Sequence, residues 1–199
     1  MIKESLIARK DLPAVIVEKL VTIISAEAAQ RLYAKHEIPL DLAVDLAGRT
    51  RERATVDFIT QSWVRRDLHS LISRLDAEDR LTTTLIVRAA CCGQMRFCEH
   101  ALAQKSGVNP AKAALMVHDG GPFGLKALCE QAGLGARDFA ILRASLVIYK
   151  DLEAAGAKLS REKYQSLMLE RVLSLPITFS DADTDYLLEK LDAVSAITA

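Results

Sequence analysis

The sequence predicts an all-α protein of about ten helices in antiparallel hairpins, arranged as a HEAT-like α-α superhelix or an irregular helical array. Apolar residues recur at helical spacing in almost every segment, whereas the alternation typical of strands is nearly absent. Half of the 199 residues are hydrophobic and only 5% are aromatic, with abundant Leu and Ala, which also favours helices. No linker rich in Pro, Gly or Ser divides residues 1–199, so a single helical domain is expected.

Three helices are expected before residue 77. Pro13 suits the first turn of the first helix, whose buried stripe is expected at Ile16, Leu20, Ile24, Ala28 and Leu32. Pro39 opens the second, with its buried side expected at Leu42, Leu46, Ala54 and Phe58. The third covers residues 62–76 and turns inward Val64, Leu68, Leu71, Ile72 and Leu75. A helical pattern is present from residue 2 without a cap, so the chain could be the C-terminal part of a longer helical protein.

Capping residues delimit the next three helices. Thr82 is expected to cap the fourth helix, which Gly93 stops. The fifth runs over residues 94–105 and ends at the Ser-Gly pair that follows. Asn109 caps the sixth, with Pro110 in the first helical position, where its missing N–H has no intrahelical partner to lose.

Four more helices complete the prediction. The sequence Asp-Gly-Gly-Pro at residues 119–122 interrupts the chain, and a seventh helix follows over residues 123–132. The eighth covers residues 136–155, the ninth runs from a cap at Ser160 to about residue 173, and Ser180 caps the last.

Three of the four cysteines and a histidine lie within residues 88–100, which suggests a metal site at first sight. Cys98 and His100 are two residues apart in an expected helix, so their side chains point to opposite faces. Cys91 and Cys92 are adjacent at a helix end and cannot easily bind one ion together. We therefore expect buried thiols and no metal, with a redox or modification role as the alternative.

Residues 102–116 fit the spacing of a helix-turn-helix, with Ala103 four residues before the turn glycine, Gly107. A recognition helix needs polar side chains that can reach base edges. The outward positions would instead be Pro110, Ala111, Ala114 and Leu115. Nucleic-acid binding through this segment is thus the alternative function, and a packed helical hairpin is the preferred interpretation.

A group of arginines and one glycine-rich turn are the expected protein-binding residues. Nine basic and six acidic side chains lie in residues 49–96, although i, i+4 spacing places carboxylates near some of these arginines. A solvated charged face is the simpler interpretation, and docking of an acidic partner segment is the functional one. The expected contacts are Arg49, Arg51, Arg53, Arg65, Arg66, Asp119, Gly120 and Gly121.

Composition and motifs argue against other classes of function. Lysine plus arginine equal aspartate plus glutamate at 26 each, so the chain lacks the basic excess usual in nucleic-acid binders. The four histidines are scattered and no catalytic or nucleotide-binding motif is present, so neither an enzyme nor a cofactor is expected. The chain has no run of 18 apolar residues and no signal peptide, which predicts a cytoplasmic protein without a membrane segment.

Several motifs in a fixed order resemble a bacterial family of uncharacterised helical proteins with HEAT-like repeats, known only as a domain of unknown function. They lie at residues 11–13, 18–21, 51–55, 107–108, 118–128, 132–134, 168–172 and 185–188. The resemblance covers nearly the whole chain and corresponds to the C-terminal part of longer members. It implies a helical fold and transfers no catalytic residue. With the absence of site chemistry, it makes a non-enzymatic scaffold for protein–protein interaction the expected function.

Overall fold

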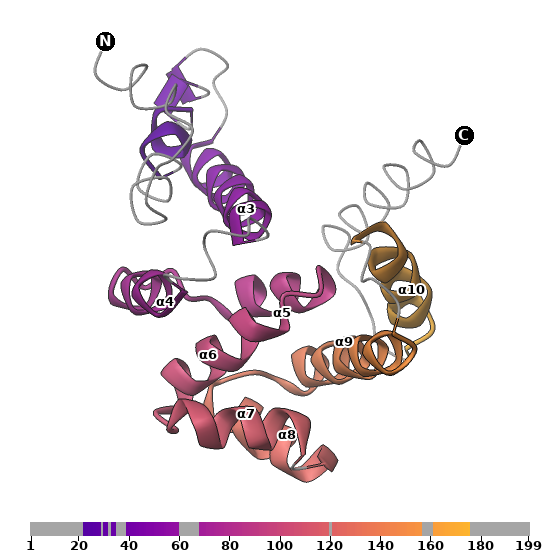
Figure 1. The fold of residues 1–199 in the computed structure, drawn as a ribbon. Coiled ribbons are helices and arrows are strands. Elements are labelled where there is room, and N and C mark those ends of the chain that lie inside the picture. Colours follow the sequence, from indigo (N-terminus) through magenta and orange to yellow (C-terminus); the bar gives the residue numbers. More distant parts are fainter. Residues whose placement is uncertain are drawn as a thin grey trace. The chain divides into compact units, whose positions relative to one another are not determined.

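The computed structural model describes residues 22–28, 30–31, 33–34, 39–59, 68–119, 121–156 and 161–175 (Figure 1). All regular secondary structure in these ranges is helical, which confirms the all-α prediction. The chain divides into two compact units, Met1–Arg80 and Leu81–Ala199, and each is described by itself. The single domain expected from the sequence stays a prediction, and the expected helix after Ser180 lies outside the described residues.

In the first unit, α3 (Leu40–Ile59) follows Pro39 as predicted, but its buried side differs from the expected one. Leu42 and Leu46 are 48% and 41% exposed, so their predicted burial is wrong, whereas the predicted burial of Phe58 is confirmed. The buried stripe starts one residue further along, at Ala43 and Ala47. The leucine stripe and the alanine stripe both repeat every four residues, so periodicity alone does not show which of them is buried. In the structure, the smaller alanines are the buried residues. In the segment before α3, Ile24 is 47% exposed, so its predicted burial is wrong as well.

A pair of substitutions tests this stripe. Ala43 is fully buried, so Ala43→Leu should lower the free energy of unfolding of the first unit by about 1–3 kcal/mol through overpacking. Leu42→Ala, at a half-exposed position, should change it by no more than about 0.5 kcal/mol. Urea unfolding of the two variants beside the parent chain measures both values, and a larger loss from Leu42→Ala would restore the stripe expected from the sequence.

The next described helix, α4 (Leu68–Ala77), buries the residues predicted for it within its bounds. These are Leu68, Leu71, Ile72 and Leu75. The expected start at Ser62, and Val64, lie outside the described residues. Beyond α4, the Arg80 guanidinium donates to the hydroxyl of Thr22 at 2.7 Å, which ties the turn after α4 to the helical segment at residues 22–28. Burial lowers the pKa of Arg80.

In the second unit, α5 (Thr83–Cys91), α6 (Met95–Ser106) and α7 (Pro110–His118) begin and end close to the predicted residues. The Thr82 hydroxyl accepts a hydrogen bond from the Leu85 amide at 3.0 Å, and the Asn109 side chain accepts one from the Ala111 amide at 3.0 Å. Gly107 ends α6 with φ 68°, a left-handed conformation that glycine adopts without strain. Capping side chains and a glycine in the adjoining turns thus determine where these three helices begin or end.

The remaining helices are α8 (Gly121–Gln131), α9 (Ala136–Ala154) and α10 (Arg161–Leu173). The predicted start of α8 at Phe123 is wrong, because the helix begins two residues earlier. Pro122 lies in its first turn, where a missing backbone N–H removes no intrahelical hydrogen bond. The predicted ends of α9 and α10 are confirmed to within one residue, while the expected cap at Ser160 lies outside the described residues.

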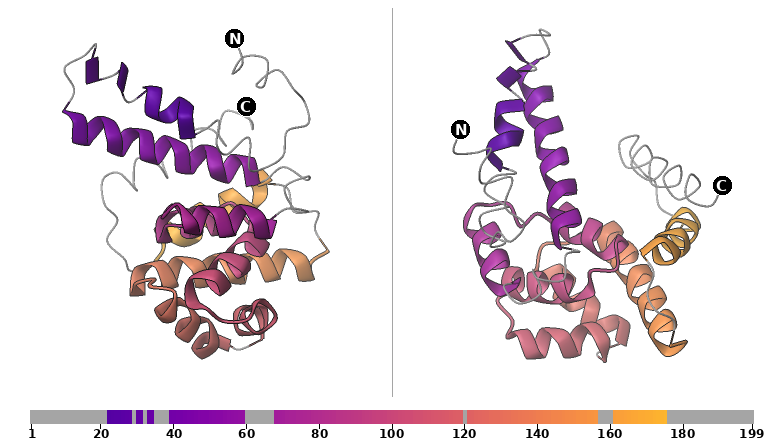
Figure 2. Two further views of the ribbon diagram at one scale, coloured as in Figure 1. Left: turned by 90° about the vertical axis from the view of Figure 1, so that its left-hand side faces the viewer. Right: turned by 45° about the horizontal axis from the view of Figure 1, so that its top comes forward.

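Helices that are distant in sequence pack together in the second unit. Consecutive pairs such as α6 with α7 and α9 with α10 are in contact, but α5 also contacts α9, and α6 contacts α8 (Figures 1 and 2). In a regular solenoid each repeat contacts its sequence neighbours alone. The second unit therefore has the irregular helical array, one of the two arrangements that the sequence left open.

Tyr164 of α10 joins three helices at the centre of this unit. Its side chain is 1% exposed, and its hydroxyl donates toward the carbonyl oxygens of Ala90 at 2.9 Å and Ser145 at 3.0 Å. These acceptors belong to α5 and α9. Gly93, after α5, lies beside the aromatic ring, and its φ of 76° favours glycine at this position. One side chain thereby joins α5, α9 and α10 in the core of this unit.

Candidate functional surface

The residues proposed from the sequence are divided between the two units. Arg49, Arg51 and Arg53 lie on α3, while Asp119 and Gly121 are exposed at the junction of α7 and α8. Arg65, Arg66 and Gly120 lie outside the described residues. The structure brings Asp119 and Gly121 together in one turn. It gives no placement of that turn relative to the arginines.

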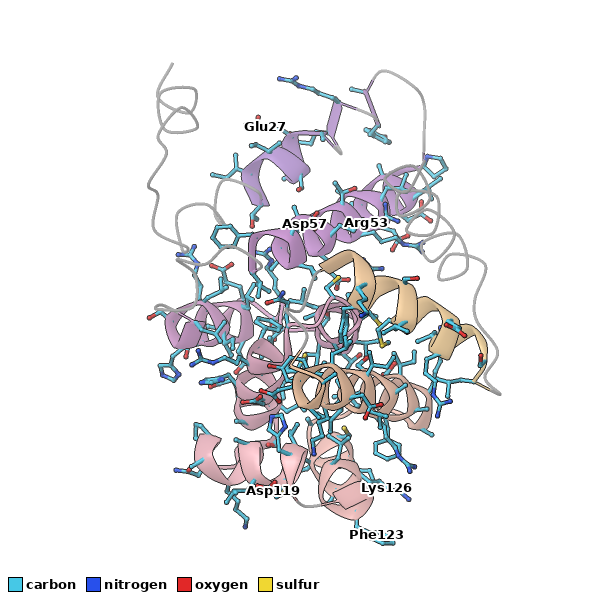
Figure 3. All side chains as sticks on the ribbon, turned by 45° about the vertical axis from the view of Figure 1, so that its right-hand side comes forward. Glu27, Arg53, Asp57, Asp119, Phe123 and Lys126 are labelled. Carbon is cyan, nitrogen blue, oxygen red and sulfur yellow. The ribbon has the colours of Figure 1, made fainter. Side chains whose placement is uncertain are left out.

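The arginines of α3 are less available than the sequence suggests. Arg49 forms an ion pair with Asp45 at 2.9 Å, one helical turn away, and both side chains are about half exposed. Such an exposed pair contributes about 0.3–0.5 kcal/mol. Arg51 and Arg53 are half-buried, and Figure 3 shows Arg53 and Asp57 on successive turns of α3. Their role in protein binding stays a prediction.

Among the described residues of the second unit, the exposed faces of α7 and α8 carry the most exposed large apolar side chains. Phe123 is 84% exposed and Leu115 is 59% exposed. Figure 3 shows Phe123 projecting away from α8, with Lys126 and Asp119 at the same end of the unit. We define the α7–α8 surface as Lys112, Leu115, Asp119, Phe123, Lys126 and Glu130, all of which are exposed.

Sequence reasoning had placed Leu115 on the outward side of its helix, which is confirmed, but it had not singled out Phe123. The available signal was the buried stripe of α8 at Leu125, Leu128 and Cys129. These side chains repeat every three or four residues along one face of the helix. Phe123 lies two residues before the first of them, about 200° around the helix, and so points away from the core.

Close packing fixes α7 against α8. A Cβ on Gly124 would lie 3.1 Å from the carbonyl oxygen of Met116, so the absence of a side chain lets the two helices approach closely. Leu115 directly precedes Met116 in the chain, and Phe123 directly precedes Gly124. The close contact between Met116 and Gly124 therefore sets the distance between the two helices that carry these apolar side chains.

Polar contacts hold the C-terminal end of α7. The imidazole Nε2 of His118 lies 2.8 Å from a carboxylate oxygen of Glu99 on α6, and both side chains are less than one third exposed. The Lys150 ammonium of α9 donates to the carbonyl oxygen of His118. Both α6 and α9 thus contact this end of α7 and support the surface from behind.

The four cysteines are free thiols, and three of them lie in the interior. Cys92, Cys98 and Cys129 are buried, which confirms the predicted core position of Cys98. The thiol of Cys98 donates to the carbonyl oxygen of Ile86 at 3.5 Å, within the helical core. Burial raises the pKa of Cys91 to about 12 and also raises that of Cys98. Because the thiolate is the reactive form, a reactive role is disfavoured.

Within the described ranges, no three His, Cys, Asp or Glu side chains are grouped so that they could hold a metal ion. His100 instead places its Nδ1 2.8 Å from the carbonyl oxygen of Arg96, in its own helix. Among the helices of these ranges, none has the length and apolar character needed to cross a membrane. The α7–α8 surface carries the two most exposed of the large apolar side chains in the described residues, Phe123 and Leu115.

The segment at residues 102–116 does form two helices joined at Gly107, and Ala103 and Ala113 are buried at the junction. The second helix, α7, exposes Pro110, Ala111 and Leu115 beside Lys112. Apolar side chains of this kind contact bases poorly apart from the thymine methyl group.

The comparisons with known proteins agree with the resemblance noted in the sequence. The family described as "Uncharacterised protein conserved in bacteria (DUF2336)" matches residues 1–175. No curated protein and no solved structure matches the chain. Because the match spans most of the sequence and both structural units, the chain belongs to DUF2336, a family of uncharacterised proteins conserved in bacteria.

Proposed function

We propose that this protein is a non-enzymatic cytoplasmic scaffold that binds another protein through the α7–α8 surface. The observation that carries the proposal is the 84% exposure of Phe123. Removing a phenylalanine side chain from water stabilises a complex by about 1.5–3 kcal/mol. Aromatic residues are enriched at the centres of protein interfaces, which makes Phe123 the expected anchor.

The way in which the surface is held also supports protein binding. Phe123 and Leu115 project from packed helices, and the close approach of Gly124 to Met116 fixes their spacing. A preorganised surface loses little conformational freedom on binding, so more of the contact energy contributes to affinity. The charged residues Lys112 and Glu130 add a polar rim to the apolar centre, as in typical interfaces.

Nucleic-acid binding through residues 102–116 is the alternative, and the turn geometry at Gly107 is the observation in its favour. It requires α7 to act as the recognition helix. The exposed cation of that helix within the motif is Lys112, beside Leu115. The alternative therefore predicts binding that weakens steeply with salt and depends on Lys112.

Phe123→Ser tests the proposal. Tagged full-length chain is used to capture proteins from nuclease-treated extract of its own cells, and captured proteins are quantified by mass spectrometry. The substitution should reduce recovery of a specific partner about tenfold or more, because it removes the burial energy of one aromatic side chain. The fold should be unchanged by circular dichroism, since the side chain is mostly in water.

Val147→Ser is the matched control, because Val147 is 45% exposed on α9 of the same unit. It should leave recovery unchanged. Equal loss with both substitutions, or with neither, would contradict a binding site at the α7–α8 surface. Recovery that disappears with nuclease and with Lys112→Ala would favour the nucleic-acid alternative.

A further inference from the structure

The charges at the two ends of α7 are placed against the helix dipole. Lys112 is the third residue of the helix, and Asp119 is its C-cap. The N-terminal turn of a helix carries partial positive charge and the C-terminal turn partial negative charge, so each exposed side chain lies at the end of like sign. An isolated α7 would be more stable with these two charges exchanged. At the C-terminal end, the Lys150 ammonium of α9 offsets part of this cost within the unit, and charges from outside the unit can offset the rest.

The same residues form one stripe on the exposed side of α7. Lys112, Leu115 and Asp119 follow one another at steps of three and four residues, which places them along one face of a helix. All three are exposed. The stripe thus has a cation at one end, an apolar residue in the middle and an anion at the other end.

A second copy of the same helix is complementary to this stripe when it runs antiparallel. Lys112 lies three residues before Leu115 and Asp119 lies four residues after it. A twofold axis near Leu115 therefore places Lys112 opposite the partner's Asp119 and the two leucines against each other. Each lysine then faces both a carboxylate and the negative end of the other helix, which offsets its unfavourable position in its own helix.

The neighbouring helix, α8, also exposes side chains of both charges. On α8, Phe123, Lys126 and Glu130 are exposed at steps of three and four residues, and Lys126 lies 3.7 Å from Glu130. The α7–α8 surface as a whole carries two lysines, one aspartate and one glutamate. The chain has zero formal net charge, so two copies are not kept apart by long-range repulsion.

We propose that two copies of this protein associate through the α7–α8 surface, with α7 of one copy antiparallel to α7 of the other. The inference rests on the proposed function, since it names the partner of that surface as a second copy of the chain. Leu115 and Phe123 supply the apolar centre, and Lys112 pairs with the partner's Asp119 twice, once on each side of the axis. A different protein would need to supply the same pattern, whereas a second copy has it by symmetry.

Charge reversal tests the pairing in the purified full-length chain. Sedimentation equilibrium should show a dimer for the parent. Lys112→Asp and Asp119→Lys should each weaken it about tenfold or more at low salt, because each places like charges opposite one another at both ends of the contact. The double variant should recover dimerisation. An equimolar mixture of the two single variants should also form a dimer, because each copy then supplies the charge that the other lacks.

Thermal unfolding is the control for folding of these variants. Lys112→Asp places a negative charge in the first turn of α7, where the helix dipole favours it, so thermal unfolding of this variant should show no loss of stability. A parent chain that sediments as a monomer up to about 100 μM would overturn the inference, since that limit leaves association weaker than about 5–6 kcal/mol. Dimers that are indifferent to the charge reversals would overturn it as well.

The two proposals fail in distinguishable ways. A monomeric chain that still loses a different captured protein with Phe123→Ser would keep the proposed protein-binding function and overturn the self-association. A dimer that follows the charge-reversal pattern while Phe123→Ser abolishes it supports the inference. If the dimer follows that pattern but Phe123→Ser leaves dimerisation unchanged, the role of Phe123 at the α7–α8 surface is overturned.

Discussion

Replacing Tyr164 with alanine is expected to lower the free energy of unfolding of the second unit by about 3–5 kcal/mol. The side chain is among the largest that are fully buried, and it lies between α5, α9 and α10. Its removal leaves a cavity that three helices must close, and it also removes the hydrogen bonds to two carbonyl groups. Domains of this size are stable by about 5–15 kcal/mol, so the loss is a large part of the total. Urea unfolding followed by far-ultraviolet circular dichroism measures it.

Tyr164→Phe separates the two contributions, because it keeps the ring and removes the hydroxyl. Ala90 still accepts a hydrogen bond from the Gly93 amide at 2.9 Å, so its carbonyl oxygen is not left without a partner. The expected loss is therefore about 1 kcal/mol. A phenylalanine variant as unstable as the alanine variant would contradict the view that packing of the ring dominates.

Alkaline pH is expected to destabilise the second unit through its buried thiols. Burial, together with the negative charges of Asp138 and Glu130, raises the pKa of Cys129 from its ordinary value of 9.0 to about 12. The folded thiol thus keeps its proton where the unfolded one has lost it. Stability from this group is fully present below pH 9 and falls as the pH rises toward 12, by about 1.4 kcal/mol per pH unit. Over that window one thiol contributes about 4 kcal/mol.

The measurement is the free energy of unfolding between pH 8 and 11 for the parent and for Cys129→Ala. Lysines, tyrosines and the other thiols also titrate in this range, so the difference in slope between the two chains is the quantity that reports on Cys129. The variant should be less sensitive to pH, even if the lost sulfur lowers its stability at every pH. Parallel curves for the two chains would show that Cys129 is accessible to water in the folded protein.

The parts of the fold that were predictable from the sequence are those set by a few neighbouring residues. Thr82 and Asn109 cap their helices because their side-chain oxygens accept backbone N–H groups two or three residues away. Gly107 ends α6 because it adopts a left-handed conformation. Each of these signals is complete within four residues, so no knowledge of packing was needed.

The errors concern which of two possible faces is buried. On α3, Leu42 and Ala43 begin stripes with the same period, and the choice of the alanine stripe depends on the surfaces that pack against it. Larger side chains are usually the buried ones, and here the smaller ones are. Which face is buried depends on contacts with residues distant in the sequence, and the periodicity of a single helix gives no information about those contacts.

The candidate surface was predictable in part. The turn at Asp119 and Gly121 was identified from its glycines, and the outward position of Leu115 followed from helical spacing. Phe123 was missed because no buried face was assigned to this helix from the sequence. The stripe at Leu125, Leu128 and Cys129 places Phe123 on the outer face.

The contact between Gly124 and the backbone of Met116 has a consequence for how members of this family can diverge. Position 124 is only partly accessible, yet the spacing of Leu115 and Phe123 depends on its lack of a side chain. A single methyl group there would meet the carbonyl oxygen of Met116 and push α8 away from α7. Two relatives could therefore display identical outer residues and still fail to recognise the same partner, because the difference between them would be hidden between two helices.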